Sequence, residues 1–284
     1  MTRLVAVPNV SEGRDAAVLD AIQAAFAEHA DVLHRSEDPD HHRAVFMLAA
    51  PPGRLHRALA RGAASAAEHI DLRRHDGLHP RVGALDVAPV VYLNDADRGA
   101  AIAEALLAAD AIGAAGVPVF LYGELAGGRT RAELRSGGPE RLAARVANRE
   151  LAPDYGPLHV DPQAGATLVA ARRPLIAFNL VLAPPVSLET ARAIAARIRE
   201  SGSDGLPGVR ALGLHLERQH LVQVSTNIED HRSVRARDVL AAVERHHPVA
   251  RAELVAPAPE AALAGWPPAV RLDMPPTIEA LLDR

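Results

Sequence analysis

The segment richest in chemically competent side chains runs from His75 to Asp86 and reads H-D-G-L-H-P-R-V-G-A-L-D. His75 and His79 stand four residues apart, the spacing at which two histidines share one helix face in zinc sites. Gly77 and Pro80 disfavour a helix, so we expect an extended or turning loop that leads into a buried strand. A histidine held at such a junction titrates near neutral pH and is suited to take up and return a proton. We therefore predict His79 as a general acid/base.

A second histidine-bearing loop keeps a metal site open as an alternative. The run D-P-D-H-H spans Asp38 to His42, and its two histidines together with His75 and His79 form a possible ligand set. The chain contains no cysteine, which excludes thiolate nucleophiles and thiolate zinc sites. It also contains no lysine, which excludes a Schiff-base lysine and the lysine of a phosphate-binding P-loop. The preferred interpretation is proton transfer without a metal.

Length and composition predict a globular enzyme-like protein. The chain has 284 residues with 49% hydrophobic content, enough for one large core or two medium ones. A net charge of −4 and only 3% aromatic residues disfavour nucleic-acid binding. No segment approaches the roughly 20 apolar residues that span a bilayer, and the N-terminus lacks the pattern of a signal peptide. We expect a cytoplasmic protein that does not bind membranes.

Apolar periodicity predicts strands that alternate with helices of about 15 residues, typical of helices that cover a sheet. The expected helices are 15–29, 54–69, 97–112, 140–149, 188–200 and 234–246. The expected strands are 3–7, one that begins at 31–33, 44–49, 84–93, 117–122, 174–182 and the hairpin 211–216 with 221–226. The stretch 126–165 is rich in Gly, Pro, Asp and Arg and predicts a long irregular connection. We place a domain boundary near Arg172.

Two further loops are candidates for ligand binding. P-N-V-S-E-G, from Pro8 to Gly13, joins a strand to a helix and can direct backbone N–H groups at an anion; Asn9 is its candidate substrate contact. An ordinary capping loop is the alternative. G-P-L-H-V-D-P-Q-A-G, from Gly156 to Gly165, is stiff, turn-rich and suited to approach a flat heterocycle, although a structural linker explains it equally well.

Several of these stretches together resemble one family, the glutamate formimidoyltransferases (formiminotransferases). The matching motifs keep the order of the family and span the chain up to about Val255. They are V-P-N-V-S-E-G at 7–13, H-D-G-L-H-P-R-V-G-A-L-D at 75–86, V-F-L-Y-G-E at 119–124, P-D-Y-G-P at 153–157, G-A-T at 165–167, L-I-A-F-N at 175–179 and Q-V-S-T-N at 223–227.

The resemblance implies transfer of a formimino group from N-formimino-L-glutamate to N5 of tetrahydrofolate, a step of histidine degradation that feeds one-carbon metabolism. Tetrahydrofolate is then the co-substrate, and no metal is required. The implied fold is α/β (α+β) with two subdomains, 1–172 and 173–284. In each, a mixed sheet is covered by helices on its outer face, with the two sheets facing each other. A homodimer is implied. Some members carry a fused cyclodeaminase domain, for which this chain is too short.

The resemblance also assigns site residues. The histidine of H-P-R is the family's acid/base and falls on His79, with Asp38 or Asp86 as electrostatic support for its imidazole. Arginines such as Arg43 and Arg81 are candidate clamps for substrate carboxylates. The folate-binding stretch falls on the loop after P-D-Y-G-P, which consists of Gly156, Pro157, Leu158, His159, Val160, Asp161, Pro162, Gln163, Ala164 and Gly165.

Three positions depart from the pattern of the family. Leu78 stands where many members have glutamate, His42 where they have asparagine, and Ala164 where an aromatic residue is common. These changes keep two alternatives open, a glutamate formyltransferase that acts on N-formylglutamate and a non-catalytic folate-binding homologue.

Overall fold

A computed structural model of the chain describes residues 3–77 and 79–283. The chain divides into two compact units, Met1–Arg172 and Arg173–Arg284. The assignment of these units to the two subdomains of one family stays a prediction. Leu78, one of the three departures, lies outside the described residues.

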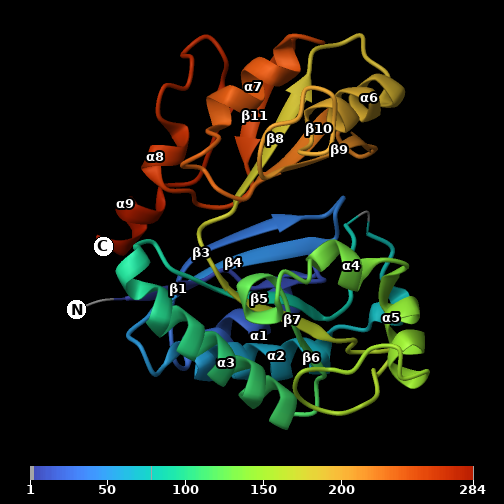
Figure 1. Cartoon of the computed structure of the whole chain (residues 1–284), viewed down its shortest axis with the longest axis vertical. Helices are drawn as coiled ribbons and strands as arrows, with labels where there is room; N and C mark the ends of the chain where they lie inside the picture. The colour runs from blue at the N-terminus through green and yellow to red at the C-terminus, as the bar shows by residue number, and fades with distance from the viewer. Residues whose placement is uncertain (1–2, 78, 284) are drawn as a thin grey trace. The chain divides into compact units, whose positions relative to one another are not determined.

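The sheet of the first unit follows the order β1-β4-β2-β5-β7-β6, with β3 paired to β4 (Figure 1). Its β5–β7 and β7–β6 pairs are parallel and its other pairs antiparallel. The described strands are β1 (Leu4–Ala6), β2 (Asn9–Val10), β3 (Asp31–Asp38), β4 (Arg43–Ala50), β5 (Leu85–Val91), β6 (Val119–Leu121) and β7 (Thr167–Arg172). Every residue of β5 is buried, which explains the unbroken apolar run typical of a central strand.

Helices cover both faces of this sheet. One face packs against α1 (Ala16–Ala27), α2 (Leu55–His69) and α3 (Arg98–Ala114). Leu55, Leu59 and Ala63 recur every four residues and line the buried side of α2. Part of the other face packs against α4 (Arg131–Arg135) and α5 (Gly138–Ala147). The short 3-10 helices are η1 (Leu72–Arg74), η2 (Asp95–Asp97) and η3 (Gly123–Ala126).

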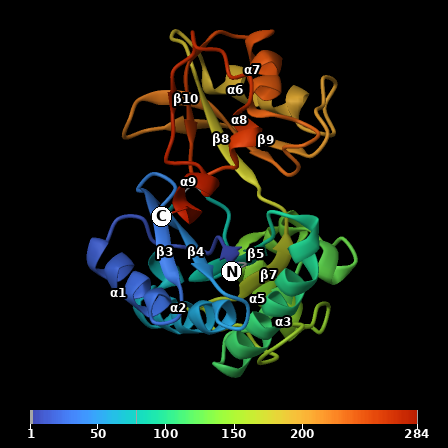
Figure 2. The same cartoon turned by 90° about the vertical axis from the view of Figure 1, so that its left-hand side faces the viewer.

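The second unit has a sheet of order β12-β11-β8-β10-β9, in which only the β11–β12 pair is parallel (Figure 2). The described strands are β8 (Ile176–Leu182), β9 (Val209–Leu216), β10 (Leu221–Ile228), β11 (Val249–Leu254) and β12 (Leu272–Asp273). The helices are α6 (Leu188–Ile198), α7 (Ala236–Glu244), α8 (Glu260–Leu263) and α9 (Ile278–Leu282). Apolar side chains of α6 and α7 pack on one face of the sheet.

The predicted fold class is confirmed, since both sheets are mixed and both carry packed helices. That the two sheets face each other stays a prediction. The sequence reasoning missed β7, which lies between β5 and β6 in the first sheet. It also placed 126–165 as a mainly irregular connection, whereas α4 lies there besides the expected helix near 140–149. None of the helices in the described residues is long and apolar enough to cross a membrane.

Candidate active site

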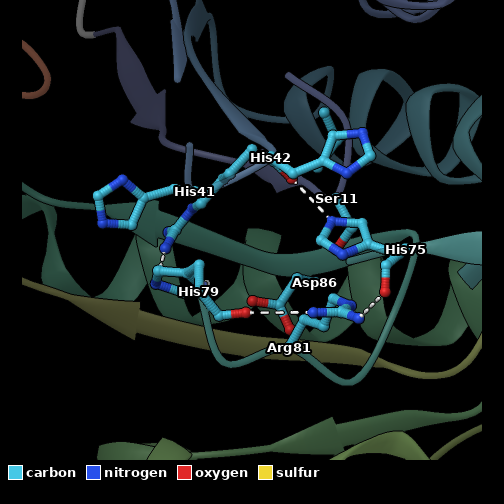
Figure 3. Close-up of a pocket in the computed structure, with 9 residues that line it drawn as sticks. Ser11, His41, His42, His75, His79, Arg81 and Asp86 are labelled. Atoms are coloured by element: carbon cyan, nitrogen blue, oxygen red, sulfur yellow. Dashed lines mark hydrogen bonds between the residues drawn. The ribbon is translucent and has the colours of Figure 1, made fainter. Parts of the chain in front are cut away.

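Four histidines from two loops meet in the first unit, between the turn before β4 and the loop before β5 (Figure 3). They form two pairs. The rings of His42 and His75 stack with centroids 4.2 Å apart and an angle of 19°. The rings of His41 and His79 lie 6.3 Å apart and are tilted by 58°. None of the described residues between His75 and Asp86 is helical, as Gly77 and Pro80 predicted.

His79, the predicted acid/base, is held in its neutral form. The guanidinium of Arg43 donates a hydrogen bond to Nε2 of His79, so this nitrogen carries a lone pair and no proton. Burial, followed by the positive charges of Arg43 and Arg135, holds the pKa of His79 well below its usual value near 6.5. The imidazole is therefore a base near neutral pH.

Arg43 is the half-buried cation next to His79. Burial of its guanidinium, then the nearby charge of Arg135, lowers the pKa of Arg43 to about 9, and the carboxylate of Asp86 opposes that shift. The Nε of Arg43 is buried and has no hydrogen-bond partner among the described residues. Arg43 begins β4, and its backbone packs against Gly13, where a Cβ would lie 2.5 Å from the Arg43 nitrogen.

Asp86 and Asp38, the two predicted supports of the imidazole, contact other groups. Asp86 is 2% exposed; one of its oxygens accepts from the backbone N–H of Val82 and the other from the guanidinium of Arg135. Asp38 contacts His41 instead of His79, with 2.6 Å between its carboxylate and Nδ1. Neither carboxylate hydrogen-bonds His79 within the described part of the chain, and their support of His79 stays a prediction.

His75 and Arg81 hold the loop that carries His79. His75 donates from Nε2 to the carbonyl of His42 at 2.8 Å, and its Nδ1 accepts from the N–H of Gly77 at 3.1 Å. The guanidinium of Arg81 donates to the carbonyl of His75 at 2.6 Å (Figure 3) and to the carbonyl of Gly77 at 3.2 Å. Arg81 thus binds backbone in this structure, and its predicted role as a carboxylate clamp is untested.

The P-N-V-S-E-G loop positions His42. Glu12 accepts from the backbone N–H groups of Gly13, Arg14 and Asp15, and it also contacts Nε2 of His42 at 3.0 Å. The side-chain amide of Asn9 donates to the carbonyl of Val7. Asn9 is not among the described residues that line the small space between the four histidines. The loop therefore caps and braces the turn, and the assignment of Asn9 to substrate stays a prediction.

The predicted folate loop, 156–165, packs against the segment between His79 and β5. Ala84 donates its N–H to the carbonyl of Ala164, and Ala166 donates to that of Val82. Gly165 has a φ of +70°, and a Cβ there would lie 2.1 Å from the Val82 oxygen. All residues of this loop are described. None of them lines the small space between the four histidines or the larger cavity of about 320 Å³ that also contacts His79. Its folate role remains to be tested.

A larger cavity also has His79 in its lining. The cavity of about 320 Å³ is lined by His79, Arg81, Arg135, Glu140 and the segments around them. Arg135 comes from α4 and Glu140 from α5, within the stretch that the sequence predicted as irregular. In the described residues no group of three or more His, Asp or Glu is arranged to hold a metal ion. Both ring nitrogens of His75 are already used by backbone groups.

Sequence reasoning missed several polar residues. Arg131 stacks on the ring of Tyr122 at 5.6 Å and, with Arg135, adds positive charge near His79. In the second unit, Asn179 and Gln223 are buried, and amide atoms of both have no partner among the described residues. The motifs L-I-A-F-N and Q-V-S-T-N contain these two residues, so the resemblance was the only signal for them.

Fold and site together define an α/β protein in which an unprotonated histidine accepts a hydrogen bond from one arginine and lies near a second arginine that pairs with Asp86. The profile of the formiminotransferase domain, N-terminal subdomain, matches residues 3–172. Glutamate formimidoyltransferase of Streptococcus pyogenes serotype M1 is 36% identical over 228 residues, 78% of this chain and 76% of that protein. The Thermoplasma acidophilum protein of the same name is 34% identical over 240 residues, covering 82% and 78%.

Longer relatives match as well. Formimidoyltransferase-cyclodeaminase of Sus scrofa is 38% identical over 246 residues, which cover 81% of this chain and 44% of that protein. The chain therefore spans less than half the length of the bifunctional relatives that it matches. The chain belongs to the formiminotransferase family.

Proposed function

We propose that the chain is a glutamate formimidoyltransferase that moves the formimino group of N-formimino-L-glutamate to N5 of tetrahydrofolate. The observation that carries the proposal is the neutral His79, hydrogen-bonded by Arg43 at the edge of an arginine-lined cavity. Two relatives that carry this activity in their names match about four-fifths of the chain. Both substrates carry carboxylates, which buried guanidinium groups recognise through paired hydrogen bonds.

The reaction needs one base at the attacking nitrogen. As N5 of tetrahydrofolate attacks the amidine carbon of the donor, N5 must lose a proton, and the departing glutamate nitrogen must gain one. His79 is kept unprotonated at neutral pH by burial and by Arg43, so it is ready to take the proton from N5. Arg43 can turn its guanidinium from the imidazole to a substrate carboxylate, which frees Nε2 of His79 at the moment of binding.

The remaining assignments are part of the same proposal. The loop 156–165 is the folate contact, Asn9 and Arg81 contact the substrates, and Asp38 and Asp86 tune the charge of the site. The backbone of the loop is hydrogen-bonded to the segment between His79 and β5 through Ala164, and Gly165 pairs with Gly83 in that segment, which supports this assignment by fixing the loop there. A cytoplasmic homodimer that acts in histidine degradation is the expected setting.

A transfer assay tests the proposal directly. Purified protein is supplied with tetrahydrofolate and either N-formimino-L-glutamate or N-formyl-L-glutamate, and the folate product is followed by absorbance. We expect transfer from the formimino donor and, in His79→Ala, a fall in kcat of about 10²- to 10⁴-fold. His69→Ala removes an exposed histidine of α2 and serves as the control with full activity.

Other outcomes would redirect the assignment. Transfer from the formyl donor alone would identify a glutamate formyltransferase. Tight tetrahydrofolate binding in calorimetry without transfer from either donor would identify a folate-binding homologue. Unchanged turnover in His79→Ala would refute the role of His79.

A further inference from the structure

His41 has the orientation of a proton-transfer residue. Its Nδ1 lies 2.6 Å from a carboxylate oxygen of Asp38. The other oxygen of Asp38 accepts from the backbone N–H groups of Asp40 and His41, each at 2.9 Å. A carboxylate fixed by three hydrogen bonds holds the ring in one orientation, as in other carboxylate–histidine pairs.

The state of Asp38 agrees with this arrangement. Burial raises the pKa of the Asp38 carboxyl, but the hydrogen bond and charge of His41 and two backbone N–H groups outweigh that effect, so the pKa is lowered. Asp38 is therefore a carboxylate throughout the neutral range. The second nitrogen of His41, Nε2, has no hydrogen-bond partner in the part of the chain that the structure describes.

His41 is also a member of the histidine cluster whose ring has one nitrogen oriented by a carboxylate and the other without a described partner. His75 uses both ring nitrogens on backbone groups. His42 contacts Glu12 and stacks on His75. His79 accepts a hydrogen bond from Arg43 at Nε2 and holds no proton there to give away. In Figure 3, His41 and His79 lie together on one side of the cluster, away from the other two rings.

We propose that the reaction uses two histidines, with His79 as the base at the attacking nitrogen and His41, oriented by Asp38, as the acid at the departing nitrogen. This inference rests on the proposed function and refines it, because the family resemblance assigns both proton transfers to the single histidine His79. His41 would contact the substrate, and Asp38 is its positioning residue.

The proposed steps balance. N5 of tetrahydrofolate forms a bond to the amidine carbon while the π pair of the C=N bond moves to the imino nitrogen, and the N5 proton passes to Nε2 of neutral His79. The C=N bond then re-forms as the bond from that carbon to the glutamate nitrogen breaks, and the electron pair of the broken bond stays on the glutamate nitrogen. Protonated His41 supplies the proton from Nε2. After the products leave, His79 returns its proton to His41 through water, across 6.3 Å between ring centres.

The test compares two donors in wild-type protein, His41→Gln and His79→Ala. One donor is N-formimino-L-glutamate. The other is the S-formimidoyl thioimidate of 2-mercaptoglutarate, which has the same carboxylates but leaves as a thiolate that needs no proton. With the nitrogen donor, we expect His41→Gln to lower kcat about 10²-fold or more with KM within about threefold of wild type. With the sulfur donor, kcat should stay near the wild-type value, whereas His79→Ala is slow with both donors.

A second variant and a control protect the test against a folding defect. Asp38→Asn keeps an oxygen for the two backbone N–H groups but removes the carboxylate from His41, and it should show the same selective loss with the nitrogen donor. His69→Gln is the matched histidine control, and thermal midpoints of all variants verify the fold. Wild-type kcat in His41→Gln, or an equal loss with both donors, would overturn the acid role of His41. Wild-type protein inactive with both donors would overturn the proposed function and this refinement with it.

Discussion

Protonation of His75 should loosen the loop that carries His79. Burial is the largest cause that lowers the pKa of His75, from 6.5 to about 4, and the charges of Arg81 and His42 act in the same direction. The contacts explain the resistance to protonation. Nδ1 accepts from the N–H of Gly77, and a proton on Nδ1 would place two donors against each other. The neutral ring therefore holds the turn in place.

The sign and window follow from the two pKa values. Above pH 6.5 the ring is neutral in both the folded and the unfolded chain, so the full stability is present. Between pH 6.5 and about 4 the unfolded chain binds a proton that the folded chain does not. The free energy of unfolding therefore decreases as the pH is lowered through this range. The loss is at most about 3 kcal/mol, because each pKa unit is worth about 1.4 kcal/mol and the ring is partly solvated.

The assay is chemical denaturation of wild-type protein and of His75→Gln at several pH values between 7.5 and 4.5. The three tyrosines all lie in the first unit and the single tryptophan, Trp266, in the second, so tyrosine absorbance isolates the unit of interest. His79 and His34 also have lowered pKa values, hence only the difference between the two proteins reports on His75.

The expected result is a wild-type curve that falls more steeply with acid than the curve of His75→Gln. His69→Gln, at an exposed ring of α2, should follow the wild type throughout. Parallel curves for wild type and His75→Gln below pH 6.5 would refute the reasoning, and so would an NMR titration midpoint of His75 near 6.5.

Two further substitutions test packing around the site, both by denaturant midpoints. Asp86→Asn strands the guanidinium of Arg135, only 12% exposed, and should cost about 3–5 kcal/mol, more than Glu28→Gln in an exposed ion pair; similar losses would contradict this. Gly165→Ala adds a Cβ that would lie 2.1 Å from the carbonyl oxygen of Val82. Gly116 also has a positive φ, but a Cβ there meets nothing within 4 Å, so Gly165→Ala should lower the stability more than Gly116→Ala. Equal losses of stability in the two variants would contradict this reasoning.

Local sequence patterns predicted the elements that depend on local forces. The ends of α2 and α3 lie within two residues of those expected, because their apolar spacing and the absence of internal proline are properties of the segment itself. The loop around His79 was predicted for the same reason, since Gly77 and Pro80 restrict the backbone locally. β7 was missed because T-L-V-A-A-R is short, lies at the expected boundary and becomes a strand through pairing with β5 and β6.

The arrangement of the site depends on contacts that adjacent residues do not encode. Asp86 lines the same small space as His79, and its ion-pair partner is Arg135, 49 positions later in α4. The pairing of Asp38 with His41 is local, an i,i+3 contact in the turn before β4. The run D-P-D-H contains both partners, so the local turn is enough to bring them together. The expected support of His79 by these two carboxylates stays a prediction.

At position 43 an arginine stays positively charged where a lysine would lose much of its charge. Burial and neighbouring cations bring the pKa of this guanidinium to about 9, so it stays charged at neutral pH and keeps donating to His79. A lowering of the same size would bring a lysine, ordinarily near 10.4, to about 7, and half of its charge would be lost there. Only a guanidinium is basic enough to remain a cation in this setting. The hydrogen bond that His79 accepts therefore depends on an arginine that burial does not neutralise.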